Sequence, residues 1–220
     1  MDQSRVTIVA EIGVNHGGSL ALAGEMITVA AQAGADWVKF QFFDAARLAG
    51  GTSRYDMLKP LELPYETMAG LQMLAHVHRV EFFATPFDEE ALARLVKLGV
   101  PAIKVASSDL TNLPFLRAVA ATGFPVILST GMADFDAIER ALAHLGRDDV
   151  TLLHCTSSYP TAMEDVNLLA MVSMLERYAG NVGLSDHSLG IWVPIAARAL
   201  GALVIEKHLT LSRKMVGPDH

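Results

Sequence analysis

Two histidines stand where short apolar runs end, His187 after the first run and His208 after the second. Apolar runs of this length, separated by a helical segment, are typical of neighbouring parallel strands in an α/β fold. Because side chains alternate between the faces of a strand, His187 shares a face with Ser185, and His208 shares a face with Glu206. Two imidazoles at the carboxyl ends of adjacent strands suit a divalent metal whose other positions are left to water or substrate. The alternative is two separate histidines, each satisfied by hydrogen bonds.

Eight strand-like segments must position such residues, and seven helix-like segments alternate with them. The strands are predicted at residues 6–11, 36–41, 80–85, 101–106, 125–129, 150–155, 181–187 and 202–208, with helices at 19–34, 65–78, 88–98, from 112, 133–145, 164–178 and 190–201. This alternation predicts a (β/α)8 TIM barrel. No linker or composition shift marks a boundary, so residues 1–220 are expected to form a single domain. An eighth helix after His208 is not predicted.

In a TIM barrel the chemistry lies at the carboxyl ends of the strands, so the last inward-facing residues form one set. The set combines lysines, hydroxyls, carboxylates and imidazoles: Glu11, Lys39, Gln41, Thr85, Lys104, Ser107, Ser129, Ser185, His187, Glu206 and His208. Lys39 and Lys104 have apolar flanks, and a buried ammonium is costly unless it is paired. Two lysines with several hydroxyls favour a pocket for phosphate or another polyanion. The alternative is that each lysine pairs with a nearby carboxylate, such as Glu11 or Glu206.

Composition excludes several classes of protein. The 220 residues are 51% hydrophobic and 19% charged, which indicates a large core. The net charge of −7, without a basic cluster, disfavours nucleic acid and acidic membranes as partners. No apolar run approaches the roughly 18 residues of a membrane helix, and no signal peptide precedes the first strand. The single cysteine, Cys155, is expected to be a small buried core residue, and a cytoplasmic location is expected.

Short motifs along nearly the whole chain resemble, in order, those of the sialic acid synthase family. They are Ala10–Gly18, Val38–Gln41, Ala84–Phe87, Ile103–Ser107, Ser129–Met132, Cys155–Thr156 with Tyr159–Pro160, Gly183–His187, Glu206–His208 and Gly217–His220. The family includes N-acetylneuraminate, legionaminate and pseudaminate synthases and spore-coat polysaccharide proteins. Its members condense phosphoenolpyruvate with an N-acetylmannosamine-type sugar on a TIM barrel, using manganese or magnesium. The resemblance therefore implies this reaction and a divalent metal, Mn²⁺ or Mg²⁺.

The resemblance also implies a role for each matching residue. Both lysines and four hydroxyl residues would hold phosphoenolpyruvate: Lys39, Thr85, Lys104, Ser107, Ser129 and Ser185. His187 and His208 would ligate the metal. The acceptor, an N-acyl amino sugar, would contact Glu11, Gln41, Tyr159 and Asp219. Glu11 and Asp109 are the candidate catalytic carboxylates, because a carboxylate near the enolic carbon can stabilise cationic character or position water there.

Two features depart from the family pattern. Asp109 follows Ser108 where many members have Gly-Glu, so this carboxylate is one methylene shorter. Family members also continue into an eighth helix and a C-terminal antifreeze-like domain, which reaches into the active site of a partner subunit in a homodimer. Two alternatives to a synthase stay open. One is a metal-dependent aldolase or isomerase acting on phosphosugars, and the other is a truncated barrel that binds ligand without turnover.

Overall fold

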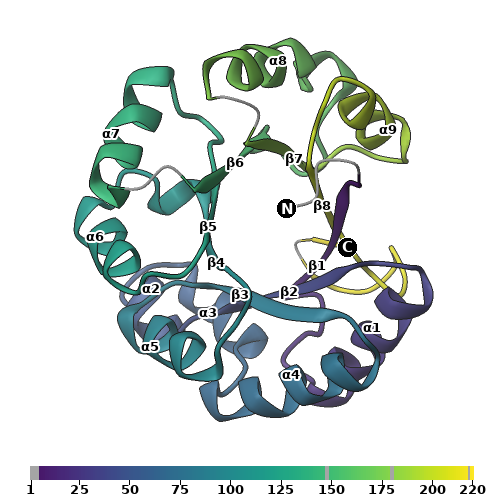
Figure 1. Cartoon of the computed structure of the whole chain (residues 1–220). Coiled ribbons are helices and arrows are strands. Elements are labelled where there is room, and N and C mark those ends of the chain that lie inside the picture. The colour runs from purple at the N-terminus through teal and green to yellow at the C-terminus, as the bar shows by residue number, and fades with distance from the viewer. Residues whose placement is uncertain (1–4, 147–148, 179–180, 218) are drawn as a thin grey trace. The chain divides into compact units, whose positions relative to one another are not determined.

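The computed structural model describes residues 5–146, 149–178, 181–217 and 219–220 (Figure 1). The expected lead into the first strand, residues 1–4, and Pro218 of the last family motif lie outside the described residues. No helix in the described part of the chain is long and apolar enough to cross a membrane.

Eight strands form one sheet in the order β3-β2-β1-β8-β7-β6-β5-β4. They are β1 (Thr7–Gly13), β2 (Trp37–Phe42), β3 (Glu81–Pro86), β4 (Ile103–Val105), β5 (Val126–Ser129), β6 (Val150–Cys155), β7 (Val182–Asp186) and β8 (Val204–His208). The pairs β2–β3, β5–β6, β6–β7 and β7–β8 are parallel. Consecutive strands are neighbours and helices alternate with them, which confirms the predicted (β/α)8 TIM-barrel fold class. Every predicted strand is found, with its ends shifted slightly.

Seven longer helices correspond to the seven predicted ones. They are α1 (Leu20–Gln32), α4 (Met68–Val77), α5 (Glu89–Leu98), α6 (Leu113–Ala121), α7 (Phe135–Leu145), α8 (Leu168–Arg177) and α9 (Trp192–Ala199). Ser19 caps α1, because its hydroxyl accepts from Leu22 N at 3.3 Å. Helix α8 begins later than predicted, since Asn167 takes a left-handed conformation with φ 46° and caps the helix from there. Beyond β8, the described residues 209–217 and 219–220 contain no helix.

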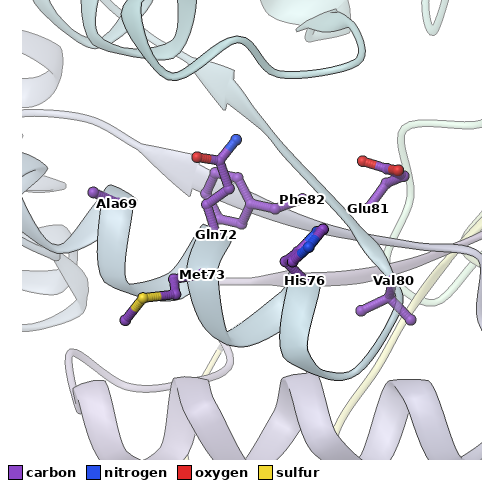
Figure 2. Close-up of a pocket in the computed structure, with 7 residues that line it drawn as sticks. All are labelled: Ala69, Gln72, Met73, His76, Val80, Glu81 and Phe82. Atoms are coloured by element: carbon purple, nitrogen blue, oxygen red, sulfur yellow. The ribbon is translucent and has the colours of Figure 1, made fainter.

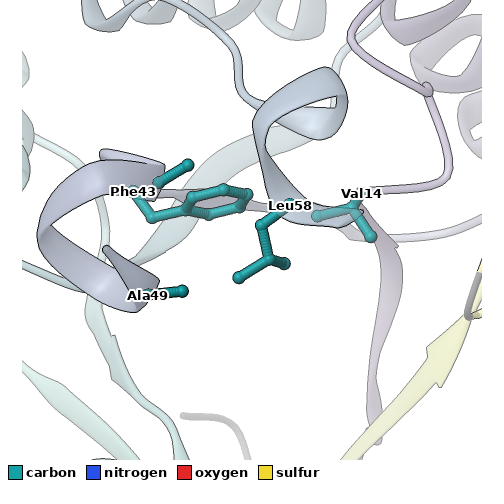
Figure 3. Packing of buried hydrophobic residues seen from close by; sticks show 5 residues of the cluster. Val14, Phe43, Ala49 and Leu58 are labelled. Atoms are coloured by element: carbon teal, nitrogen blue, oxygen red, sulfur yellow. The ribbon is translucent and has the colours of Figure 1, made fainter. Parts of the chain in front are cut away.

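The excursion between β2 and α4 contains two short helices that the sequence did not predict, α2 (Ala45–Ala49) and α3 (Tyr55–Leu58). They bury a small apolar cluster made by Val14, Phe43, Ala45, Ala49 and Leu58 (Figure 3). Val14 belongs to the turn after β1, so this cluster packs the excursion against that turn. The turn is thereby supported at the place where β1 ends.

The chain divides into two compact units, whose boundaries fall within β1, β4 and β8. The described residues of 1–9 and 104–207 form unit 1, in which α6 to α9 accompany β5 to β8 (Figure 1). Those of 10–103 and 208–220 form unit 2, with β2, β3 and α1 to α5. In unit 2, Phe40 and Phe82 are buried with ring centroids 5.6 Å apart. The prediction that residues 1–220 are a single domain stays a prediction.

Candidate active site

In unit 2, the lysine at the end of β2 lies in a buried polar cluster. Lys39 Nζ is 3.2 Å from Glu11 Oε1 and donates to Thr85 Oγ1 at 3.3 Å. Gln41 Nε2 donates to the same Glu11 oxygen at 2.9 Å. Lys39 is only 4% exposed, and burial of its ammonium is compensated by the ion pair. The structure therefore brings together four residues of the predicted set. Lys39 forms the ion pair with Glu11 that was the alternative to a phosphate pocket, and it also contacts the Thr85 hydroxyl.

His208 and Asp219 lie beside each other in the same unit, with His208 Nδ1 3.7 Å from Asp219 Oδ2. Burial raises the pKa of the Asp219 carboxyl, the nearby Glu11 raises it further, and His208 opposes the change. Only the resemblance indicated Asp219, because it follows the last strand and has no strand or helix periodicity to mark it. The structure places it next to a predicted metal ligand.

The turn after β1 holds this last segment. Asn15 Nδ2 donates to Leu209 O at 2.8 Å and to Asp219 O at 3.0 Å. Leu209 N donates to Glu11 O at 2.8 Å. Asn15 has no role among the residues predicted from the sequence, although it lies in the motif Ala10–Gly18.

In unit 1, the second lysine is also buried at the end of its strand. Lys104 Nζ donates to Ser129 Oγ at 2.6 Å and to Val105 O at 3.0 Å, and this lysine is only 2% exposed. Ser129 is the last residue of β5. Two of the residues predicted to bind phosphoenolpyruvate thus contact each other across neighbouring strands, and the phosphate pocket itself stays a prediction.

A row of polar side chains crosses β6, β7 and β8 in unit 1. The strand register pairs Cys155 with Ser185, and Ser185 with Glu206. Ser185 Oγ donates to Glu206 Oε1 at 2.9 Å. Cys155 is a buried free thiol, as predicted. Parallel register therefore brings these strand ends to one level.

Ser107 follows β4 and lies against the end of β6. Its Oγ accepts from Gly131 N at 3.0 Å and lies 3.3 Å from Cys155 Sγ. A Cβ at Gly131 would lie 2.3 Å from Ser157 Oγ and 2.9 Å from Ser107 Oγ, so a side chain at this position would have to push both hydroxyls aside. The glycine thus keeps Ser107 in contact with the loop after β5.

Asp109 lies in the short 3₁₀ turn Ser107–Asp109 and accepts from Asn112 Nδ2 at 3.1 Å. Burial raises the pKa of the Asp109 carboxyl, and the hydrogen bond from Asn112 opposes this change. Because burial favours the protonated form, this side chain keeps its proton to a higher pH than an ordinary carboxyl does.

The environment of His187 fits a metal-binding imidazole. Its Nδ1 lies 2.7 Å from Thr156 O, which can only accept, so Nδ1 carries the hydrogen and Nε2 carries the lone pair. Nε2 lies 3.4 Å from Ser185 Oγ, and the hydrogen-bonded alternative would need the serine hydroxyl to donate to Nε2 instead of to Glu206. The half-exposed Tyr159 ring covers the imidazole, with ring centroids 4.0 Å apart. Among the described residues, no group of three or more His, Cys, Asp and Glu side chains is arranged to hold a metal ion, and the two-histidine site stays a prediction.

Two residues that sequence reasoning left without a role join the ends of β7 and β8. Lys207 Nζ donates to an oxygen of the Asp186 carboxylate and, at 2.7 Å, to Ser188 O. The other Asp186 oxygen accepts from Ser188 N at 3.0 Å. Alternation along the strands places these side chains on the face opposite to that of the predicted site residues. They hold the backbone on both sides of His187.

A cavity of about 280 Å³ lies at the amino end of β3, away from Thr85 (Figure 2). Its lining comes from α4 and the start of β3: Ala69, Gln72, Met73, His76, Val80, Glu81 and Phe82. Thr85 stands near the carboxyl end of the same strand. This cavity is therefore separate from the predicted residues of unit 2.

Three comparisons relate this chain to known proteins. A model described as the NeuB family matches residues 26–220. The N,N'-diacetyllegionaminic acid synthases of Legionella pneumophila and Campylobacter jejuni are 43% and 42% identical over 97% and 98% of this chain, which spans 66% and 71% of their lengths. The crystal structure of an N-acetylneuraminic acid (sialic acid) synthetase from Leptospira borgpetersenii, in complex with citrate, matches 96% of this chain and 75% of that chain with a TM-score of 0.92 and 40% identity.

Proposed function

This chain belongs to the NeuB family, and on that premise we propose that it condenses phosphoenolpyruvate with an N-acyl amino sugar of the N-acetylmannosamine type. The products would be a nonulosonic (sialic-type) acid and inorganic phosphate. The relatives it resembles are nonulosonic acid synthases, which supports an enzymatic function of this kind. The chain spans 66% of the length of the Legionella synthase. The activity of a full-length synthase is therefore a proposal for this chain.

The observation that carries the proposal is a pair of buried lysines, each bonded to a hydroxyl of a neighbouring strand. Lys39 contacts Thr85 in unit 2, and Lys104 contacts Ser129 in unit 1. An ammonium has three donors and prefers anionic acceptors, so each of these lysines suits a phosphate or carboxylate oxygen of phosphoenolpyruvate. We propose that Ser107 and Ser185 complete the phosphoenolpyruvate contacts.

The bond changes follow from the charges. The vinyl carbon of phosphoenolpyruvate attacks the aldehyde carbon of the open-chain sugar, and cationic character develops at the enolic carbon. Glu11 is proposed to stabilise that charge, since Lys39 and Gln41 hold its carboxylate in one orientation. Asp109, with its raised pKa, suits the transfer of a proton. Water then adds to the enolic carbon, and the intermediate collapses with loss of phosphate, whose charge Lys39 and Lys104 balance.

His187 and His208 are the proposed ligands of a divalent metal, Mn²⁺ or Mg²⁺. When bound, the metal supplies Lewis-acid polarisation of the aldehyde oxygen. The hydrogen bond from His187 Nδ1 to Thr156 O supports this role, because it leaves the Nε2 lone pair as a ligand. Gln41, Tyr159 and Asp219 are proposed to contact the sugar.

Two further proposals concern the state of the protein. We propose a homodimer, as in the family that the sequence resembles. We also propose a cytoplasmic location, which the single buried free thiol of Cys155 supports, because a reducing compartment keeps such a thiol reduced.

The test of the reaction is a coupled assay of phosphate release from phosphoenolpyruvate. The purified chain is incubated with N-acetylmannosamine or N-acyl diamino sugars, with and without Mn²⁺. We expect release that requires phosphoenolpyruvate, a sugar and the metal together. Consumption of a phosphosugar without phosphoenolpyruvate would instead support the aldolase or isomerase alternative. Ligand binding without any phosphate release would support a non-catalytic barrel.

The test of the metal site uses His187→Ala and His208→Ala, with His144→Ala, a half-buried residue in the last turn of α7, as the matched control. Each of the first two changes should abolish Mn²⁺ binding, measured by titration calorimetry, and activity, while circular dichroism stays unchanged. The control should bind Mn²⁺ like the unchanged protein. Activity within a few-fold of normal in both site variants would reject the assignment.

A further inference from the structure

Asn15 joins two parts of unit 2 that are far apart in the sequence. One amide nitrogen, Asn15 Nδ2, donates to Leu209 O at 2.8 Å and to Asp219 O at 3.0 Å. These carbonyls are close to the two ends of the segment that follows β8. Asn15 is only 1% exposed, so the donor of these two partly buried hydrogen bonds is sheltered from water. This amide thus holds residues near both ends of the segment 209–219 against the turn after β1.

This segment carries or borders two residues of the proposed reaction. His208 directly precedes Leu209, and Asp219 supplies one of the captured carbonyls as well as the carboxylate that lies 3.7 Å from His208 Nδ1. The described residues of the segment form no helix or strand of their own, so turns and side-chain contacts must hold it. Its backbone position therefore depends on contacts with other parts of unit 2.

The turn that presents Asn15 is itself well supported. Asn15 N donates to Ile12 O at 2.9 Å, and Gly17 N donates to Val14 O at 2.9 Å. Gly18 has φ 77° and packs so closely that a Cβ there would lie 2.2 Å from Pro60 O. A donor on such a turn can impose its position on a segment that has less structure of its own.

We propose that Asn15 is a positioning residue, which holds the segment 209–219 so that His208 and Asp219 are presented to the metal and the acceptor sugar. The catalytic part of this inference rests on the proposed function, whereas the structural part does not. An amide is required because both captured groups are carbonyls, which only accept hydrogen bonds. A carboxylate at this position would offer no donor and would face two carbonyl dipoles.

Limited proteolysis tests the structural part without any assay of activity. Trypsin cleaves after Arg213 and Lys214, which are exposed within the segment. In Asn15→Asp and Asn15→Ala, we expect cleavage at these two sites to accelerate about tenfold, since losing one or two neutral hydrogen bonds changes a local opening equilibrium by roughly that factor. Mass spectrometry separates these cuts from cuts elsewhere in the chain. Asn167→Asp is the matched control, because the α8 cap uses only the side-chain oxygen of Asn167.

Each result has a definite meaning. Unchanged cleavage at Arg213 and Lys214 would overturn the proposal, and so would equal acceleration at all sites, which would indicate general destabilisation. If neither variant folds, exchange of the Asn15 side-chain amide protons in the unchanged protein decides. Exchange as fast as that of the exposed Asn167 amide would overturn the proposal, and much slower exchange would support it.

Kinetics then test the catalytic part. The sugar KM should rise about tenfold in Asn15→Ala, while the KM for phosphoenolpyruvate stays within about twofold, because the segment 209–219 carries or borders the sugar and metal contacts. Equal rises in both constants would overturn this part. A failure of the proposed function is distinguishable, since the unchanged protein would then release no phosphate while the proteolysis result still stands.

Discussion

Several charged side chains of this protein are buried almost completely. Such burial is unusual outside functional sites. Lys39, Glu11 and Lys104 are all buried at the ends of strands. An isolated buried charge costs several kcal/mol, so such groups persist in a fold where partners compensate for lost hydration. Lys39 has Glu11 as its partner, and Lys104 makes contacts with Ser129 and a backbone carbonyl. These groups are the ones whose removal should change ligand binding most.

The variant Lys104→Met keeps most of the side-chain volume and removes the charge. We expect phosphoenolpyruvate to bind roughly ten- to hundred-fold more weakly, since a charge-assisted hydrogen bond contributes about 1.5–3 kcal/mol. Sugar binding should change much less. Steady-state kinetics with each substrate varied in turn measures both effects, and Lys97→Met on the exposed end of α5 is the control. A selective loss of sugar affinity would show that Lys104 has been assigned to the wrong substrate.

The buried imidazole of His16 should make stability depend on pH. Burial lowers the pKa of His16 to about 4 from its ordinary 6.5, while its Nδ1 accepts from Gly18 N at 3.0 Å. Between these two pH values the unfolded chain binds a proton that the folded chain does not. The free energy of unfolding should therefore fall as pH falls from 6.5 towards 4, by roughly 3 kcal/mol.

Urea unfolding at several pH values across this window measures the effect. His16→Gln removes the titrating group and should show a smaller loss of stability on acidification, whereas the control His144→Gln, at a half-buried position of α7, should behave like the unchanged protein. Parallel pH profiles for the unchanged protein and His16→Gln would contradict the prediction.

At the scale of elements, polar caps decide where helices begin. Asp88 Oδ1 accepts from Ala91 N at 2.8 Å, and Asp134 Oδ1 accepts from Ala137 N at 2.8 Å. Asp88 has a second partner, because its Oδ2 accepts from Tyr65 OH at 2.5 Å. It therefore ties the start of α5 to the turn that precedes α4, whereas Asp134 caps α7.

The two caps give a matched pair of variants. Asp134→Ala should lower the free energy of unfolding by about 1 kcal/mol, the typical contribution of a cap. Asp88→Ala should lower it by about 2–3 kcal/mol, because the partly buried Tyr65 hydroxyl also loses a charge-assisted bond. Chemical denaturation of both variants measures the difference. An equal loss in the two would mean that the contact with Tyr65 contributes nothing.

At the scale of the whole molecule, unit 1 exposes apolar side chains along α9. Trp192 and Ile195 are 74% and 54% exposed, and Ile191 and Leu200 at the two ends of the helix are exposed as well. An apolar strip of this kind on a protein surface favours association. It lies on the side of the helix opposite to the buried Val193 and Ala197.

We expect the isolated chain to self-associate as its concentration rises, and the double variant Trp192→Lys with Ile195→Lys to do so much less. The melting temperature should stay the same or rise slightly, because neither exposed side chain contributes to the core. Sedimentation velocity over a range of concentrations, together with thermal melts, measures both effects. Identical sedimentation of the two proteins would show that this strip does not drive association.

Local patterns in the sequence determined the elements of this protein and the residues at their ends. The period of apolar residues predicted every strand and the seven longer helices, because burial on one or both faces imposes that period. The same alternation predicted that the side chains of Lys39, Lys104 and Ser185 point away from the helices. In the structure, each is buried and bonded to a side chain of a neighbouring strand. The side chains that lie beside one another on adjacent parallel strands follow from the strand register, and the fold class already implies parallel strands.

Only the tertiary structure decided the features that depend on distant contacts. The short helices α2 and α3 fold around Phe43 and Val14, which no local period announces. Asn15 and Asp219 are 204 positions apart, and their hydrogen bond exists only because the segment after β8 lies beside the turn after β1 in unit 2. Neither residue lies in a periodic stretch of sequence, so nothing in the local sequence predicts this hydrogen bond. Irregular segments are therefore positioned by specific pairs of groups, and such pairs become visible only once the chain is folded.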